Sequence, residues 1–501
     1  MESILGVVGW RVRRLRLSMG LVVGCACLCT VLPHEQRARA YPFLPPRPVP
    51  SAIAGPTDPH PAALYYNPAA LGPLTGNHVY LDGGARVHLG SVQLNATEAG
   101  PASSTPISWS DLASFVGATT DLRGNEVLHG GIAAYTPYSD FTSYGDSSLR
   151  YHAKTHTMAV FGESLAASVR IASRFWIGAA INFYEAWLRY SYDRDAAPYG
   201  GSALVDQPNA LCGAACGLEN SAARQQIDLR GFNWGVGATL GILVRPIDRL
   251  WLSLSWITRS YSPGRGPDMA LYDDRTASVS PTPNLSGNCT PAGQSFRPCQ
   301  GNDQISVVLP DIVYFGLRFE ATPRFEFEAG ARYINYGARN QLDVSLQGGN
   351  LASAGNSAAT RVPPQFLLDR GFQDTWAFWA SGRFRLRETI RLSPMLMFET
   401  SAVRTDVVNA ASIDSNKLDL SLTAEWKPTR LLRIGAHVGG TAYILGQAGQ
   451  AFSSRAAVSC VDAAYSLDAC GKISAGQGLP SADGQYTMFV LHLGASIGFD
   501  F

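Results

Sequence analysis

Apolar and polar positions alternate with a period of two along most of the chain after residue 76. From Thr487 to Phe501 the odd positions are mainly large and apolar, and the even positions are mainly small or polar. The same alternation runs through residues 232–242 and 313–320. A period of two predicts β-strands that each have one apolar face.

The face opposite the apolar one is unusual for a soluble protein. In residues 232–242 it carries glycine, asparagine and threonine, whereas a soluble sheet has charged side chains there. Charged residues make up only 16% of the chain, against about 25% in typical globular proteins. Small residues suit the lumen of a barrel whose apolar face lies in lipid. A secreted β-sandwich or propeller is the alternative, and it leaves the apolar faces uncovered.

Short turns and long loops separate the predicted strands. The turns fall at residues 121–125, 173–174, 246–249, 322–324, 386–389 and 427–430, and the loops at 195–222, 263–303, 347–370 and 446–483. Fourteen strands result, an even number, as expected of a bacterial single-chain barrel. The sequence therefore predicts an all-β fold: a 14-stranded antiparallel transmembrane β-barrel over residues 76–501.

The first forty residues have the pattern of an export signal. Four arginines between Arg11 and Arg16 precede an apolar run, and an Ala-Arg-Ala sequence ends at Ala40. This predicts a signal peptide over residues 1–40. A membrane anchor is the alternative, but the apolar run is short for a helical span. Cleavage before Cys25, as in a lipoprotein, is a further alternative.

The six cysteines after the predicted signal peptide form three close pairs in predicted loops. They are Cys212 and Cys216, Cys289 and Cys299, and Cys460 and Cys470. In an exported chain such pairs indicate local disulfides. No histidine or second pair lies at zinc-ligand spacing, so we expect neither a metal site nor a cofactor.

Residues 41–75, before the first strand, are predicted to form a plug. They are rich in proline and small apolar residues and include the stretch LYYNPAAL. A 14-stranded lumen is too wide to be filled by the side chains of its own strands. Asparagine caps turns and proline fixes φ, so Asn67 and Pro68 are expected to hold the plug backbone and contact the wall. Tyr65 and Tyr66 are expected to pack against the lumen; an unstructured periplasmic tail is the alternative.

The stretch LYYNPAALGPLTG, followed directly by the first strand, resembles a known family. In the FadL-like outer-membrane transporters of long-chain fatty acids and aromatic hydrocarbons, an Asn-Pro-Ala step, here Asn67 to Ala69, closes an N-terminal hatch. The resemblance continues in order through GGIAAYTPYSD, ESLAASVRIASRFWIGAAINF and GFNWGVGATLGILVRPIDRLWLSLSWITR. The prolines from Pro42 to Pro61 replace the family's Gly/Ala-rich acidic run, so the resemblance does not define the upper plug.

The resemblance implies passive uptake of a hydrophobic small molecule through a lumenal site and a lateral gap in the wall. Such a route keeps the molecule out of water, which is worth about 0.8 kcal/mol per CH₂ group. Pro137 cannot donate to a strand ladder, so a kink is expected from Tyr135 to Tyr138. The alternative is that Pro137 ends the strand at a loop.

Three arginines that alternation assigns to the lumen, Arg318, Arg332 and Arg383, are candidate contacts for a substrate carboxylate. The competing expectation is that each pairs with a lumenal acid such as Glu320 or Glu328.

We expect a monomer in the outer membrane of a Gram-negative bacterium, in contact with membrane lipid and without enzymatic activity. The net charge of +1 gives no electrostatic basis for binding nucleic acid. The alternative function is a structural or adhesive surface barrel with disulfide-stapled loops and a permanently plugged lumen.

Overall fold

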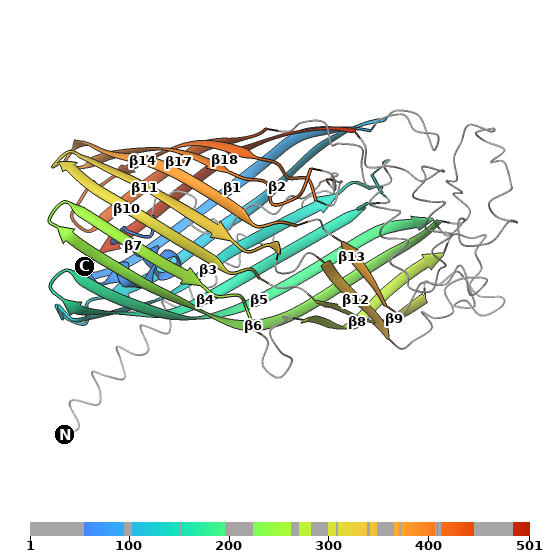
Figure 1. Ribbon diagram of the computed structural model, residues 1–501, viewed down its shortest axis with the longest axis horizontal. Coiled ribbons are helices and arrows are strands. Elements are labelled where there is room, and N and C mark those ends of the chain that lie inside the picture. The colour runs from blue at the N-terminus through green and yellow to red at the C-terminus, as the bar shows by residue number, and fades with distance from the viewer. Residues whose placement is uncertain are drawn as a thin grey trace, which may run out of the picture. The chain divides into compact units, whose positions relative to one another are not determined.

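The computed structural model forms one antiparallel sheet that closes on itself (Figure 1). The structure describes residues 55–94, 103–145, 147, 149–150, 152–195, 224–261, 270–281, 299–306, 309–337, 341–347, 365–369, 372–405, 408, 412–444 and 484–501. Closure comes from the pairing of β1 (Asn77–Leu94) with β18 (Gly484–Asp500). The predicted signal peptide and residues 41–54 of the predicted plug lie outside the described residues.

The other strands follow β1 in chain order. They are β2 (Ser103–Thr120), β3 (Leu128–Ser143), β4 (Thr155–Ala172), β5 (Phe175–Asp195), β6 (Arg224–Ile247), β7 (Leu250–Ile257), β8 (Ala270–Pro281), β9 (Cys299–Ser306), β10 (Ile312–Thr322), β11 (Phe325–Ile334), β12 (Gln341–Gln347), β13 (Gln365–Asp369), β14 (Thr375–Arg387), β15 (Ile390–Glu399), β16 (Lys417–Trp426) and β17 (Leu432–Tyr443).

A crossing is one passage of the chain from one end of the barrel to the other. Eight of the segments form their crossings in pairs, because the strand is interrupted partway along the wall. Both β7 and β8 pair with β6, for example, at different heights along it. Three further crossings are divided in the same way, into β9 and β10, β11 and β12, and β13 and β14. In each of them, the two segments form ladders with segments of a neighbouring crossing. The 18 segments therefore make 14 crossings, which confirms the predicted 14-stranded antiparallel barrel.

Two of the predicted long loops are wrong in extent. Strand β8 and the start of β9 lie within predicted loop 263–303, and β13 lies within predicted loop 347–370. The β8 sequence ALYDDRTASVSP lacks the alternating apolar face by which lipid-facing strands are recognised. Cys299 is the first residue of β9, not a loop residue as predicted, and the other five paired cysteines lie outside the described residues.

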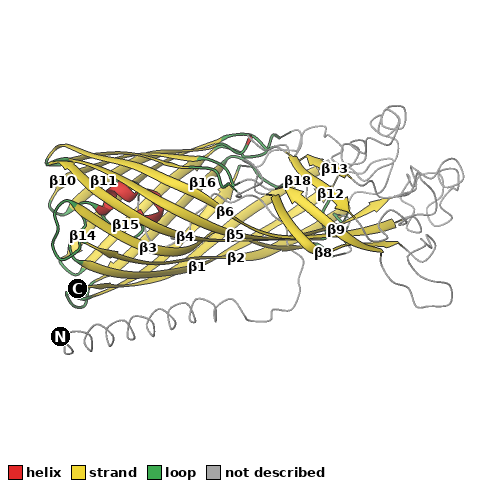
Figure 2. Ribbon diagram, turned by 90° about the horizontal axis from the view of Figure 1, so that it is seen from below, coloured by secondary structure: helices red, strands yellow, loops and turns green. Residues whose placement is uncertain are grey.

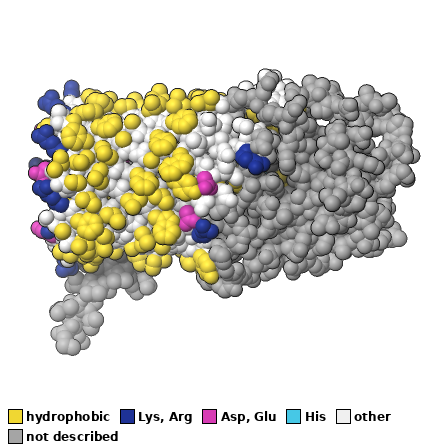
Figure 3. Space-filling model, in the orientation of Figure 1, with side chains coloured by type: hydrophobic (Ala, Val, Ile, Leu, Met, Phe, Trp, Pro, Cys, Tyr) yellow, Lys and Arg dark blue, Asp and Glu magenta, His cyan; other side chains and the backbone are white. Residues whose placement is uncertain are grey.

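The outer face carries the apolar side chains that alternation assigned to lipid. Ile181 and Leu420 have exposed fractions of 67% and 64%, while inward-facing His492 is 5% exposed. Figure 3 shows these side chains as a band, with Lys and Arg gathered at the turn end. None of the described helices is long and apolar enough to cross a membrane.

Two short helices of the predicted plug lie inside the barrel near its turn end (Figure 2). Helix α2 (Ala63–Tyr66) and the 3₁₀ helix η1 (Pro68–Leu71) are fully buried and contact strands β3 to β6. Asn67 caps η1 by accepting a hydrogen bond from the Ala69 N–H, and Pro68 occupies the first helical position. Both preferences are common at helix starts. We call residues 55–75, the described part of this segment, the plug.

Candidate functional site

The Asn67 side chain connects the start of the plug and helix η1 to each other and to the barrel wall. Its Nδ2 group donates to the Pro56 carbonyl at 2.8 Å and to the Ile242 carbonyl of β6 at 3.1 Å. Its Oδ1 atom accepts from the Ala69 N–H at 3.1 Å. The side chain is completely buried, so its amide has no access to water as a substitute partner. The plug backbone and the wall therefore depend on the same amide group.

Two glycines of the wall leave room for the plug. A Cβ atom on Gly178 of β5 would lie 2.2 Å from the Ala69 nitrogen, and one on Gly241 of β6 would lie 1.9 Å from the Asn67 Oδ1 atom. Non-bonded heavy atoms do not come this close in a close-packed interior, so a side chain at either position would clash with the plug. Alternation assigned Gly241 to the lumen, but its contact with Asn67 has no signature in the sequence.

Two serines of the wall hold carbonyl groups of the plug. Ser168 of β4 donates to the Ala69 carbonyl at 3.1 Å, and Ser255 of β7 donates to the Tyr66 carbonyl at 2.6 Å. The Tyr66 carbonyl is thereby paired in the barrel interior, and the Ala69 carbonyl, which also accepts from the Gly72 N–H, gains a second partner. Together with Gly178 and Gly241, the two serines form a surface on which the plug rests, which we call the seat.

The plug tyrosines pack against aromatic residues of the lumen. Tyr65 meets Tyr135 of β3 edge to face at 5.0 Å between ring centroids, and Tyr66 meets Tyr314 of β10 in the same way at 5.6 Å. Such pairs favour edge-to-face geometry. Tyr135 belongs to the predicted kink, so the structure brings together the two groups of residues that the sequence assigned to the plug and to the lateral gap.

A buried cluster of charges ties the plug to strands β10, β11 and β14 of the wall. The Arg383 guanidinium lies 2.8 Å from an Asp58 carboxylate oxygen and 2.9 Å from a Glu328 oxygen. The Arg318 guanidinium lies 3.6 Å from the same Asp58 oxygen. Arg332 pairs with Glu399 at 3.0 Å. All three candidate carboxylate contacts are thus paired with acids of this chain, and Asp58 was not singled out from the sequence.

An aspartate and a histidine of the plug have shifted pKa values. Burial alone raises the pKa of Asp58, but the guanidinium groups of Arg383 and Arg318 outweigh burial and hold this pKa at about 2. Burial lowers the pKa of His60 to about 3, and the nearby Arg433 charge acts in the same direction. At neutral pH the seated plug therefore carries an ionised Asp58 and a neutral His60.

Acidification is expected to loosen the plug. Exposed histidine titrates near pH 6.5, whereas seated His60 titrates at about 3, so protons bind the unseated plug preferentially between these values. The contribution of His60 to seating is complete above pH 6.5 and is lost as pH falls towards 3, and Asp58 adds an effect of the same sign below about pH 4. Ion conductance across planar bilayers should therefore rise from pH 7 to pH 4.

The matched variant for this experiment is His60→Asn, which retains an acceptor for the Ala62 N–H that His60 Nδ1 now binds at 3.1 Å. This variant should lose the rise in conductance between pH 6.5 and pH 4. A wild-type conductance that stays constant over that interval would contradict the assignment.

The wall has an irregular joint between β2 and β3. Their ladder covers only six residue pairs and ends at Phe115 with Tyr135, although both strands continue beyond it. Beyond this pair, side chains supply hydrogen bonds between the two strands. The Ser139 hydroxyl accepts one from the Leu112 N–H and donates one to the Leu112 carbonyl. Continuous main-chain pairing between β2 and β3 is therefore lost over residues 103–114 and 136–143, although each strand still pairs with its other neighbour.

Pro137 lies where this ladder ends. Strand β3 continues through it to Ser143, so the alternative in which Pro137 ends the strand is wrong. The register with β4 shifts between Tyr135 and Tyr138. Ser114 and Thr136 face each other across the joint, with their hydroxyl oxygens 2.8 Å apart.

Residues 51–474 match the family model described as "Outer membrane protein transport protein (OMPP1/FadL/TodX)". The chain belongs to this family. Its members are outer-membrane transporters of hydrophobic compounds rather than enzymes. This family member is accordingly an outer-membrane β-barrel of a Gram-negative bacterium. No curated protein sequence matches it.

Solved structures of the family share the fold. A Pseudomonas aeruginosa FadL homologue superimposes with a TM-score of 0.68 at 13% identity, covering 93% of this chain and 100% of that one. The Pseudomonas putida toluene transporter TodX gives 0.59 at 13% identity, with coverage of 93% and 100%. The Ralstonia pickettii toluene transporter TbuX gives 0.56 at 13% identity, with coverage of 92% and 98%. At this identity the likeness establishes the fold.

Proposed function

We propose that this protein takes up long-chain fatty acids or similar hydrophobic molecules, and that these leave the lumen sideways between β2 and β3. The observation that carries the proposal is the loss of the β2–β3 ladder beyond Tyr135 while both strands continue. Elsewhere in this half of the barrel the ladders are long: β1 pairs with β2 over its whole length, and β4 pairs with β5 nearly as far.

The joint is a weak point that could open without unfolding the barrel. Three side-chain hydrogen bonds of Ser139 and Ser114 cross it, each worth about 1 kcal/mol net. Opening a full ladder of the same length would break several main-chain bonds at once. A lateral exit at this point is therefore less costly than at a regular joint.

The plug supports the same route. Its two short helices lie in the lumen near the turn end, and Asn67, the seat and Asp58 connect them to the wall. A hydrophobic molecule that left through the lumen would meet this barrier and then water, whereas the lateral route delivers it to lipid. The gain is about 0.8 kcal/mol for each CH₂ group kept from water.

Among the candidate carboxylate contacts, Arg332 is the one we propose for a fatty-acid head group. Arg318 and Arg383 pair with Asp58 of the plug, so a ligand there would compete with seating. Arg332 pairs with Glu399 of the wall instead, and it lies directly opposite Tyr314, the ring that packs on Tyr66, in the pairing of β10 with β11. Because the barrel closes within one chain, we propose that a monomer suffices.

Cross-linking the joint is expected to abolish uptake. In the double variant Ser114→Cys/Thr136→Cys, the sulfur atoms replace two oxygens that lie 2.8 Å apart, within reach of a disulfide. Oxidation should then stop cellular uptake of labelled oleate, and reduction should restore it. Parallel uptake of labelled toluene distinguishes a fatty-acid transporter from a hydrocarbon transporter.

The control is Val116→Cys/Ala134→Cys, a directly opposed pair within the β2–β3 ladder. Oxidation of this pair should leave uptake unchanged because the strands are already joined there. Full uptake through a verified Ser114–Thr136 cross-link would refute the lateral exit. Absence of uptake of any hydrophobic compound by the wild type would instead favour the structural barrel.

A further inference from the structure

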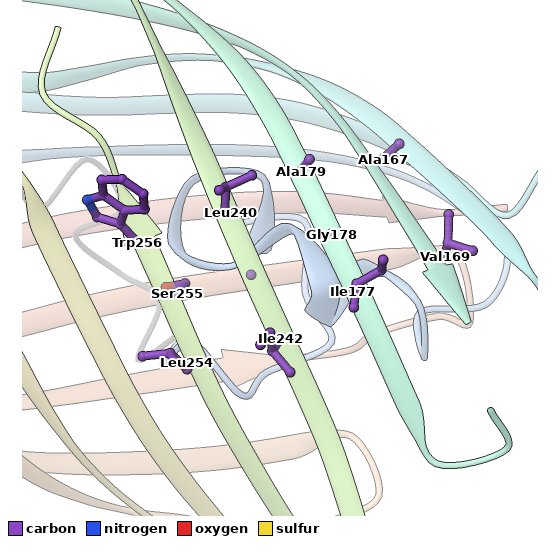
Figure 4. Close-up of a pocket in the computed structure, with 11 residues that line it drawn as sticks. Ala167, Val169, Ile177, Gly178, Ala179, Leu240, Ile242, Leu254, Ser255 and Trp256 are labelled. Atoms are coloured by element: carbon purple, nitrogen blue, oxygen red, sulfur yellow. The ribbon is translucent and has the colours of Figure 1, made fainter. Parts of the chain in front are cut away.

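A groove of about 510 Å³ lies on the outer wall across strands β4 to β7 (Figure 4). Its sides are large apolar residues that point away from the lumen, including Ile177, Leu240, Leu254 and Trp256. The small side chain of Ala179 forms part of its floor. The groove lies within the band of exposed apolar side chains, so its surroundings in the cell are lipid.

The groove is concave because the strands there carry little side-chain volume. Gly178 and Gly241 leave bare backbone at its floor, and their missing side chains would point into the lumen. Ser255 also lines the groove, but its hydroxyl donates to the Tyr66 carbonyl inside the barrel. The lining is therefore almost entirely apolar, and the floor of the groove is the outer side of the seat.

The depth of the groove places it in one leaflet. Leu254 is five residues from Arg249 in the β6–β7 turn, which corresponds to about 13 Å of depth for a strand rising ~3.3 Å per residue at a tilt of ~40°. One leaflet contributes about 15 Å of hydrocarbon. Because the short turns of such barrels face the periplasm, the groove opens to the periplasmic leaflet.

The turn end next to the groove is basic. Arg249 is exposed and makes no ion pair with the residues that the structure describes, whereas Arg174 in the neighbouring turn pairs with Asp248 at 2.8 Å. Figure 3 shows Lys and Arg side chains gathered at this end. A free guanidinium at the membrane surface attracts anionic head groups.

We propose that this groove binds an acyl chain of an anionic phospholipid of the periplasmic leaflet, with the lipid phosphate at Arg249. The groove continues the lipid-facing surface of the barrel, and its depth and adjoining charge match one such lipid. The bound chain would lie against the backbone of Gly178 and Gly241, on the opposite side from Ala69 and Asn67. The lipid would thereby support the part of the wall that holds the plug.

The test is native mass spectrometry of the purified, delipidated protein titrated with dioleoyl phosphatidylglycerol or dioleoyl phosphatidylethanolamine. The wild type should bind one phosphatidylglycerol in preference to phosphatidylethanolamine. Ala179→Phe, which fills the groove, should lower binding of both lipids by about tenfold, equivalent to about 1.4 kcal/mol. Arg249→Gln should lower the binding of phosphatidylglycerol more than that of phosphatidylethanolamine, because the ammonium group of the latter already offsets its phosphate charge.

Two matched variants control for surface changes elsewhere. Ala331→Phe adds the same volume at a position of β11 outside the groove, opposite Phe315 and Phe378. Arg430→Gln removes an exposed arginine from a different turn. Both should bind lipid like the wild type, and heat-modifiable migration in gels should show that all variants are folded.

Equal lipid binding by Ala179→Phe and the wild type would overturn the proposal. Displacement of the bound lipid by oleate at equimolar concentration would also overturn it, because the groove would then be a site for transported molecules. Neither result depends on uptake. The lipid-binding proposal can therefore fail while the transport function stands, and the transport function can fail while lipid binding stands.

Discussion

Replacing Gly178 by alanine is expected to destabilise the seated plug by about 1–3 kcal/mol, the usual cost of overpacking a well-packed site, and so to raise the ion conductance of the barrel. The new methyl group would lie 2.2 Å from the Ala69 nitrogen and 2.4 Å from the Pro68 carbonyl carbon. Both are main-chain atoms of η1, so no side-chain rotation can relieve the contact. Either η1 or strand β5 must move, and β5 is held by long ladders on both sides. The plug is the part that yields.

Gly241→Ala should act in the same direction but less strongly. Its methyl group would meet the side-chain oxygen of Asn67 at 1.9 Å, and that amide can rotate away at the cost of its hydrogen bonds to Pro56 and Ile242. Each buried group left unpaired costs about 1–3 kcal/mol.

The measurement is conductance across planar bilayers, with Gly83→Ala as the control. Gly83 is a strand glycine of β1 whose added Cβ would have no atom within 4 Å, so the substitution tests the change of residue type alone. Gly83→Ala should behave like the wild type. A Gly178→Ala protein that is folded and conducts no better than Gly83→Ala would show that the seat does not hold the plug.

Replacing Asp58 by asparagine is expected to weaken plug seating by about 3–5 kcal/mol, the usual cost of breaking a buried ion pair from one side. Asp58 holds Arg383 at 2.8 Å and Arg318 at 3.6 Å, and these arginines are almost completely buried. Arg383 retains Glu328 at 2.9 Å in the variant, so the barrel wall should stay folded while the plug loses its attachment.

The control for this variant is Asp248→Asn. Asp248 pairs with Arg174 at the same distance of 2.8 Å, but both side chains are largely exposed, and such pairs contribute about 0–1 kcal/mol. Asp58→Asn should increase conductance and make the plug sensitive to added protease at neutral pH, whereas Asp248→Asn should do neither. Equal protease resistance in the two variants would place the attachment of the plug elsewhere.

Local sequence patterns predicted the barrel because a lipid-facing strand must alternate. Strand β18, from Gly484 to Asp500, shows this requirement at nearly every position. The prediction failed where the requirement is absent, as in β8, whose charged and polar residues give no apolar face. The total of 14 crossings was nevertheless correct, because each missed segment continues a strand already counted.

The alternation, the short turns and the compact Asn-Pro segment before the first strand can all be read from the order of the amino acids. The folded barrel is needed to see that Asn67 bonds Ile242, 175 residues away, and that Asp58 meets Arg383, 325 residues away. Periodicity reports whether a side chain faces lipid or lumen. It does not report which lumenal positions meet across the barrel, because strand tilt, register and the path of the plug fix those distances together.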